Sequence, residues 1–207
     1  MTLAEHYADQ AEALCRLCHL FGKRQWCLAT SGNFSVRTGT SHCLITQSGR
    51  DKTRLTAADL MLCDLDGVPS EPGLTPSAEA ALHTLLYRLD GRTAAVLHTH
   101  SVAATVVSRA VDTEVEFSGF EMQKAIAGIA SHDCTVSLPV FENSQDMADL
   151  ATRVQQRAAH GGLTIPGFLV RGHGLYAWGN TLAQAARHVE GFEFLLSTAL
   201  HERSFRP

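Results

Sequence analysis

The chain has 207 residues, of which 45% are hydrophobic and 18% are charged. This composition is typical of a folded globular protein and excludes wholesale disorder. A formal net charge of −4 provides no overall basic field that would attract nucleic acid. No apolar run reaches transmembrane length and the acidic N-terminus has no secretory signal, so we interpret the six cysteines as reduced thiols in a cytosolic protein.

The first third of the chain predicts one helix followed by short strands. Thr2 and Glu5 form a capping box, and apolar residues continue at helical spacing until Gly22. Further on, Thr56 is a cap for a short helix over Ala57–Met61. Turn residues separate four strand-like segments, which are Trp26–Ala29, Asn33–Arg37, His42–Thr46 and Leu62–Asp64.

The rest of the chain alternates between helices and strands. Thr75 at a cap position and Pro76 at the first helical position predict a helix that runs to about Leu89. An apolar segment then predicts a buried strand over Thr93–His100. Further helices are expected at Ser101–Arg109, Glu121–Ile129, Ser144–Ala158 and Thr181–Glu202, and further strands at Thr135–Val140, Gly167–Arg171 and Leu175–Trp178. With no visible linker, these elements predict one domain over residues 1–207, built as a sheet covered by helices.

Two histidines lie at the end of the predicted strand Thr93–His100. Residues i and i+2 of a strand point to the same side, so His98 and His100 can face one metal ion, and zinc accepts imidazole nitrogen. The alternative is that they are polar residues that cap a strand. A third histidine, His173, lies between two glycines at a predicted tight turn. It is either an exposed turn residue or the third ligand of a catalytic zinc site.

Two glutamates are candidates for proton transfer. Glu79 lies in the first turn of the helix predicted from Pro76, where a carboxylate can also simply stabilise the helix dipole. Glu121 and Lys124 are neighbours at i and i+3 on one helical face, where the alternative is a surface ion pair. In the functional interpretation, one of these glutamates moves a proton beside the metal.

Three turns rich in hydroxyl groups and glycine can bind a phosphate. They are Thr30–Asn33, Ser48–Lys52 and Thr75–Ser77. Their hydroxyls and free backbone N–H groups can hold an anion, and Lys52 adds a positive charge to the second turn. Ordinary turns explain each segment equally well.

Taken in order, five motifs resemble those of the class II aldolase/adducin family. The motifs are Ser31–Arg37, Ile45–Gly49, Pro76–Glu79, His98–Ser101 and Gly172–Gly174. The resemblance covers essentially the whole chain. It implies a three-layer αβα fold in which helices flank a central, largely antiparallel sheet. It also implies a homotetramer with active sites near the subunit contacts.

The same resemblance implies roles for particular residues. The expected zinc ligands are His98, His100 and His173. The residues expected to hold the substrate phosphate are Asn33, Ser48, Gly49 and Ser77, with Lys52 nearby. Glu121 is the expected acid/base group, and Glu79 is the second candidate beside the metal.

Four segments resemble the branch of this family that removes water from a sugar phosphate. They are Ser48–Lys52, Phe120–Lys124, Gly172–Gly179 and Arg187–Leu195. This implies zinc-dependent dehydration of 5-methylthioribulose 1-phosphate to 2,3-diketo-5-methylthiopentyl 1-phosphate in methionine salvage. The main alternative is an aldolase or 4-epimerase that acts on another sugar phosphate and keeps the same zinc ligands. A non-catalytic adducin-like interaction module, which needs no zinc ligands, is the remoter alternative.

Overall fold

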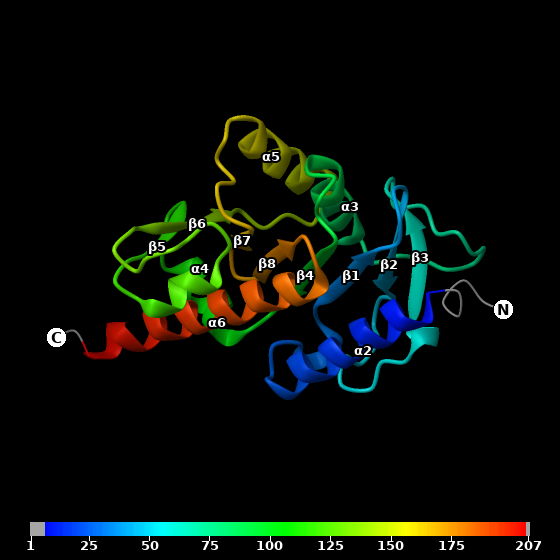
Figure 1. Ribbon diagram of the computed structural model, residues 1–207, viewed down its shortest axis with the longest axis horizontal. Helices are drawn as coiled ribbons and strands as arrows, with labels where there is room; N and C mark the ends of the chain where they lie inside the picture. Colours follow the sequence, from blue (N-terminus) through cyan, green and yellow to red (C-terminus); the bar gives the residue numbers. More distant parts are fainter. Residues whose placement is uncertain (1–6, 206–207) are drawn as a thin grey trace.

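An eight-stranded sheet forms the centre of the computed structural model, which describes residues 7–205 (Figure 1). The strand order is β3-β2-β1-β4-β8-β7-β6-β5. All neighbouring strands are antiparallel except β6 and β7, which run parallel. The strands are β1 (Asn33–Arg37), β2 (His42–Thr46), β3 (Leu60–Asp64), β4 (Ala95–Thr99), β5 (Glu114–Phe117), β6 (Val136–Phe141), β7 (Gly167–Val170) and β8 (Gly174–Gly179).

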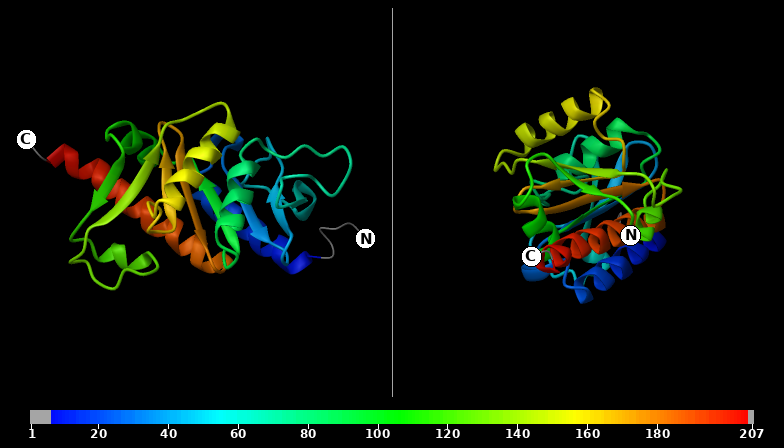
Figure 2. Two further views of the ribbon diagram at one scale, coloured as in Figure 1. Left: turned by 90° about the horizontal axis from the view of Figure 1, so that it is seen from above. Right: turned by 90° about the vertical axis from the view of Figure 1, so that its left-hand side faces the viewer.

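Helices cover both faces of this sheet, as the two views of Figure 2 show. Within the described residues the α-helices are α2 (Ala8–Lys23), α3 (Ala80–Leu89), α4 (Val102–Arg109), α5 (Met147–Ala159) and α6 (Leu182–Phe205). Three short 3-10 helices are η1 (Leu28–Thr30), η2 (Ala57–Asp59) and η3 (Glu121–Ala125). None of the described helices combines the length and the apolar character that crossing a membrane requires.

The central strand β4 shows why the sheet needs a layer on each side. Ala95 and Leu97 pack into the core formed with α2, α4 and α6, whereas Val96 packs into the core formed with α3 and α5. Side chains of a strand alternate between faces, so a strand buried on both faces is a continuous apolar run. The predicted three-layer fold with a largely antiparallel sheet is confirmed.

The end of β4 determines where the candidate site lies. His98 is the second-last residue of this strand, and the short turn between β7 and β8 brings His173 beside it. A Cβ atom at Gly174 would lie 2.0 Å from the carbonyl oxygen of Thr99. Only glycine therefore allows β8 to begin this close to the end of β4.

The helix predicted from Pro76 begins at Ala80 instead. Ser77 to Glu79 form a turn, in which the carbonyl of Ser77 accepts a hydrogen bond from the N–H of Ala80. Glu79 is the N-cap of α3, and its carboxylate contacts two histidines from other elements. These long-range contacts outweigh the local signal of a proline at the first helical position.

The structure also differs from the prediction elsewhere. The helix predicted over Ala57–Met61 ends at Asp59, because β3 already begins at Leu60, and the one predicted over Glu121–Ile129 is the shorter 3-10 helix Glu121–Ala125.

Trp26–Ala29 is not a strand, because the chain enters η1 there and Ala29 and Thr30 have φ angles of 51° and 64°. Strand β5 was not predicted, since a four-residue edge strand gives too short an alternating pattern. The capping box assigned to Thr2 and Glu5 lies outside the described residues.

Candidate metal centre and active-site pocket

Three segments bring three histidines and one glutamate together at the end of β4. His98 belongs to β4, His100 follows that strand, and His173 lies in the turn between β7 and β8. Glu79 arrives from the N-terminus of α3. One possible ligand atom from each residue lies within 4.8 Å of the other three. The structure thus brings together the three histidines that were expected to bind a metal and Glu79, the glutamate expected beside it.

Three of four separations between these atoms are close to those around a tetrahedral ion, and the fourth, between His98 and His100, is shorter. Nε2 of His98 lies 2.7 Å from Nε2 of His100 and 3.4 Å from Nε2 of His173. Oε1 of Glu79 lies 3.0 Å from Nε2 of His173 and 3.4 Å from Nε2 of His98. Zinc–ligand bonds of ~2.0–2.1 Å at tetrahedral angles separate the ligand atoms by about 3.3 Å. A cation between such closely spaced electron donors removes their mutual repulsion.

A hydrogen bond behind His98 fixes which of its nitrogens faces the cluster. Nδ1 of His98 lies 2.9 Å from the carbonyl oxygen of Leu175. A carbonyl only accepts hydrogen bonds, so Nδ1 carries the proton and donates it, and the lone pair of Nε2 points to the other ligands. The ring of Tyr176 stacks on the same imidazole, with centroids 3.9 Å apart. His98 is therefore held in the orientation that a metal ligand needs.

The charges of the cluster also suit a divalent cation. Burial, together with His98 and His173, lowers the pKa of His100 to about 3, so this imidazole is neutral near pH 7. Burial raises the pKa of Glu79, but His98 and His173 lower it by more, and the net pKa is well below the ordinary value. An ionised carboxylate beside imidazole nitrogens is a donor set that divalent metals accept. These four residues can hold a metal.

A pocket of about 810 Å³ opens over this cluster. Glu79, His100 and His173 line it. The same pocket is lined by every residue expected to hold phosphate, namely Asn33, Ser48, Gly49, Lys52 and Ser77. Three turns that are far apart in the sequence therefore meet beside the candidate metal centre.

Lys52 is the one cation in this group of expected phosphate-binding residues. Its side chain is only 1% exposed, and Nζ donates hydrogen bonds to the carbonyl oxygens of Thr30 at 3.0 Å and Arg50 at 2.8 Å. Burial lowers the pKa of Lys52 from its ordinary value. Both hydrogen-bond partners are neutral, which leaves the positive charge available to an anion in the pocket.

The pocket has a further wall that the sequence did not indicate. It consists of Asn143, Ser144, Gln145 and Met147, in the connection between β6 and α5. Because β6 and β7 run parallel, their carboxyl ends lie at the same edge of the sheet, and the residues after β6 lie beside the turn that carries His173. This wall of the pocket could be predicted only from the knowledge that β6 pairs with β7.

Glu121 lies elsewhere in the chain's own structure. It belongs to η3, its side chain is 69% exposed, and it forms ion pairs with Lys124 at 2.6 Å and His132 at 2.8 Å. It lines a second pocket, of about 760 Å³, which contains none of the three histidines of the cluster. Within one chain, therefore, the structure brings Glu79 but not Glu121 to the candidate metal centre.

The chain belongs to the class II aldolase and adducin family, because the model of the "Class II Aldolase and Adducin N-terminal domain" matches residues 12–200. Relatives named methylthioribulose-1-phosphate dehydratase match almost the whole chain. The one from Pectobacterium carotovorum subsp. carotovorum (strain PC1) is 51% identical over 198 residues, which is 94% of this chain and 95% of the relative. The one from Yersinia enterocolitica is 50% identical over 195 residues, which is 94% of this chain and 92% of the relative.

Solved structures of the same family share the fold. An L-fuculose 1-phosphate aldolase superimposes with a TM-score of 0.79 at 21% identity, over 96% of this chain and 88% of its own. The L-fuculose-1-phosphate aldolase from Thermus thermophilus gives a TM-score of 0.74 at 25% identity, over 96% of both chains. At such low identity, these likenesses establish the fold alone.

Proposed function

We propose that this protein is a metal-dependent dehydratase that converts 5-methylthioribulose 1-phosphate to 2,3-diketo-5-methylthiopentyl 1-phosphate, in methionine salvage. The observation that carries the proposal is the single pocket that joins the Glu79 and histidine cluster to the turns around Lys52. Relatives that are about 50% identical over most of the chain are named methylthioribulose-1-phosphate dehydratase, and the proposed substrate is taken from that name. The free thiols of all six cysteines suit a reducing compartment, the cytoplasm.

The metal that we assign to the site is zinc, one ion per chain. His98, His100 and His173 would hold it, with Glu79 as the fourth group within ligand distance. When bound, the ion supplies a Lewis acid that lowers the pKa of the C3–H of a ketose phosphate. The three nitrogen donors support zinc over oxygen-preferring ions.

The turns beside the cluster hold the phosphate end of the substrate. The hydroxyls of Ser48 and Ser77 and the ammonium of Lys52 supply donors to the phosphate oxygens, and Gly49 and Asn33 complete that side of the pocket. This anchoring fixes the distance between the phosphate and the reacting carbons. A substrate held by its phosphate therefore presents its reacting carbons to the cluster in a fixed orientation.

Two proton transfers complete the dehydration. The C3 proton is removed, the C4 hydroxyl leaves as water after receiving a proton, and the resulting enol relaxes to the diketone. Glu79, ionised and inside the pocket, is positioned to take part in these transfers. We assign the other acid/base role to Glu121.

Glu121 can take that role only in the pocket of a neighbouring copy, because it lies in a different pocket from the cluster of its own chain. We therefore propose a homotetramer in which the exposed face of η3 meets the active-site pocket of an adjacent subunit. The exposure of Met122 (37%) and Phe194 (49%) beside Glu121 supports a contact at this face.

A complementation experiment tests this placement of Glu121. Glu121→Gln should abolish turnover and leave the zinc content near that of the wild type, and His173→Ala should abolish zinc binding. Mixed assemblies made by co-expressing the two variants should regain activity, because a chain with an intact metal site then meets a chain with an intact Glu121. Mixed assemblies that stay inactive would contradict the shared site, and substantial activity of Glu121→Gln alone would remove Glu121 from the mechanism.

The proposed reaction itself is tested by its product. The zinc-loaded protein should convert 5-methylthioribulose 1-phosphate to a single product that has lost one water, as read by mass spectrometry. Two smaller carbonyl compounds would instead indicate cleavage of the C3–C4 bond, and an isomer of unchanged mass would indicate an epimerase. Either result would move the assignment to another member of the same family.

A further inference from the structure

Helix α6 carries a buried acidic residue that neither the metal site nor the proposed proton transfers use. Glu193 is 3% exposed, although carboxylates are rarely buried without a strong partner. It lies in the segment Arg187–Leu195 that the sequence singled out. Its Oε1 atom accepts a hydrogen bond of 2.6 Å from the hydroxyl of Thr99, and its Oε2 atom has no partner among the described residues.

The partner of Glu193 stands between two of the candidate metal ligands. Because side chains alternate along β4, His98 and His100 face the metal cluster while Thr99 points to the opposite face, where α6 packs. A hydrogen bond to Thr99 therefore holds the strand from behind, at the residue that links the two ligands.

The hydrogen bond from Thr99 to Glu193 acts at the last residue of β4 that is paired in the sheet. The last residue of β4 with a partner on β8 is Thr99, and the last with a partner on β1 is His98. His100 lies beyond both ladders, and its backbone N–H instead donates to the carbonyl oxygen of Trp26 at 2.7 Å. Without the contact between Thr99 and Glu193, this end of the strand would be held by the pairing of Thr99 with β8, by the backbone hydrogen bond of His100 and by the following helix cap.

We propose that Glu193 is a positioning residue, which fixes Thr99 and through it sets the geometry of His98 and His100 as metal ligands. Metal affinity depends steeply on ligand placement, and loss of groups that orient ligands typically weakens binding about 10- to 100-fold. Burial raises the pKa of Glu193 to about 7, opposed by the hydroxyls of Ser101 and Thr99. Burying this acid is unfavourable, and we propose that its role is to fix the end of β4.

Substitutions at both ends of the hydrogen bond test this role, which rests on the metal centre of the proposed function. Thr99→Val keeps the shape of the side chain and removes only the donor, while Glu193→Ala removes the acceptor. Each should weaken zinc binding about tenfold, the lower end of the range for orienting groups. The double variant should bind zinc no more weakly than the weaker single variant, because both changes remove the same interaction.

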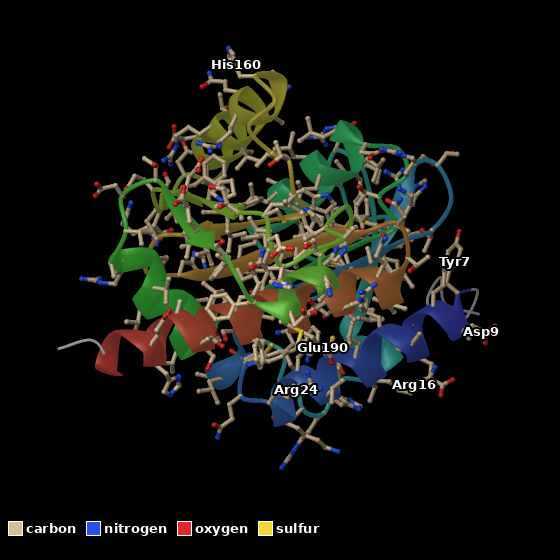
Figure 3. All side chains as sticks on the ribbon, turned by 60° about the vertical axis from the view of Figure 1, so that its left-hand side comes forward. Tyr7, Asp9, Arg16, Arg24, His160 and Glu190 are labelled. Carbon is tan, nitrogen blue, oxygen red and sulfur yellow. The ribbon has the colours of Figure 1, made fainter. Side chains whose placement is uncertain are left out.

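Two controls separate positioning from general stability. Glu193→Gln keeps an oxygen acceptor for Thr99 and should recover most of the lost affinity. Glu190→Gln changes an acid on the same helix that pairs with Arg24, the residue after α2, at 2.7 Å. Both side chains are labelled in Figure 3. Glu190→Gln should leave zinc affinity at the wild-type value.

The readouts are zinc affinity by competition with a chromophoric chelator, the visible absorption of the cobalt-substituted protein, and thermal unfolding of the metal-free protein. We expect the cobalt spectrum to shift in Thr99→Val, and the unfolding temperature of the metal-free protein measures separately the stability that is lost with the hydrogen bond. Wild-type zinc affinity and an unchanged cobalt spectrum in Thr99→Val would overturn the proposal, and this variant decides alone if Glu193→Ala does not fold. A wild-type protein that binds no zinc would instead refute the proposed metal centre.

Discussion

Replacing Lys52 by methionine tests the link between the metal cluster and the phosphate site. The Lys52 side chain is buried at the wall of the main pocket, and its ammonium is bonded to the carbonyl oxygens of Thr30 and Arg50. Methionine keeps an unbranched side chain of similar length and removes the charge. The variant therefore removes the charge that we expect to bind the phosphate, together with the two hydrogen bonds to these carbonyl oxygens.

The structure gives the size of the expected effect. A hydrogen bond from a charged donor to an anion contributes about 1.5–3 kcal/mol, which corresponds to a loss of about 10- to 150-fold in kcat/KM. We expect most of this loss in KM, because the phosphate does not react and its binding is similar in the ground state and the transition state. Zinc content should stay at the wild-type value, since Lys52 is not among the four clustered ligand residues.

The assay is steady-state kinetics with 5-methylthioribulose 1-phosphate, together with inhibition by inorganic phosphate. Lys23→Met is the matched control, because Lys23 is an exposed lysine in the last turn of α2. It should leave both kinetics and inhibition unchanged. If Lys52→Met kept the wild-type KM and the wild-type inhibition by phosphate, the assignment of this side of the pocket to phosphate would be refuted.

Three further predictions concern the metal, the strand end and a buried histidine. Removing zinc with a chelator should lower the unfolding temperature by about 5–10 °C, compared with protein in zinc at 100 times its Kd. At that concentration, zinc binding stabilises the folded protein by about 2.7 kcal/mol. An unfolding temperature that does not depend on the metal would contradict the site. Gly174→Ala should lower the free energy of unfolding by about 1–3 kcal/mol and weaken zinc binding, because the added Cβ meets the carbonyl oxygen of Thr99. The control Gly91→Ala places its Cβ in open space and should change neither stability nor zinc binding. Burial, with a contribution from His98, lowers the pKa of His83 to about 3, so below about pH 6.5 the unfolded state binds more protons and stability falls as the pH drops. Urea unfolding between pH 5 and 7 should show this loss, to which His83 contributes up to about 1.4 kcal/mol per pH unit, and His83→Gln should reduce the slope by that share. Equal slopes in both proteins would contradict it.

The candidate ligands show where sequence reasoning succeeds and where it needs the fold. The period of two along a strand was enough to place His98 and His100 on one side, because that relation is local. The approach of His173 depends on the pairing of β4 with β8, across more than 70 residues of chain. No spacing in the sequence encodes that distance, and only the resemblance to a family indicated it.

Local signals failed where long-range contacts compete with them. The proline at Pro76 and the threonine before it are good helix-start residues, yet α3 begins four residues later, where Glu79 contacts the histidines. The wall of the pocket between β6 and α5 was missed for a related reason, because it follows from the one parallel pair in the sheet. Glu193 was likewise visible only as part of a family-like segment, since its contact with Thr99 joins α6 to β4.

We propose that one metal ion, held by His98, His100 and His173 beside Glu79, makes this pocket a dehydratase site. The most direct test of this proposal is a zinc titration of the metal-free protein, with the rate of water loss from 5-methylthioribulose 1-phosphate and the bound zinc followed together. The account predicts that the rate rises in proportion to bound zinc and stops rising at one ion per chain. Full activity in the metal-free protein, or full zinc occupancy without dehydration, would contradict it.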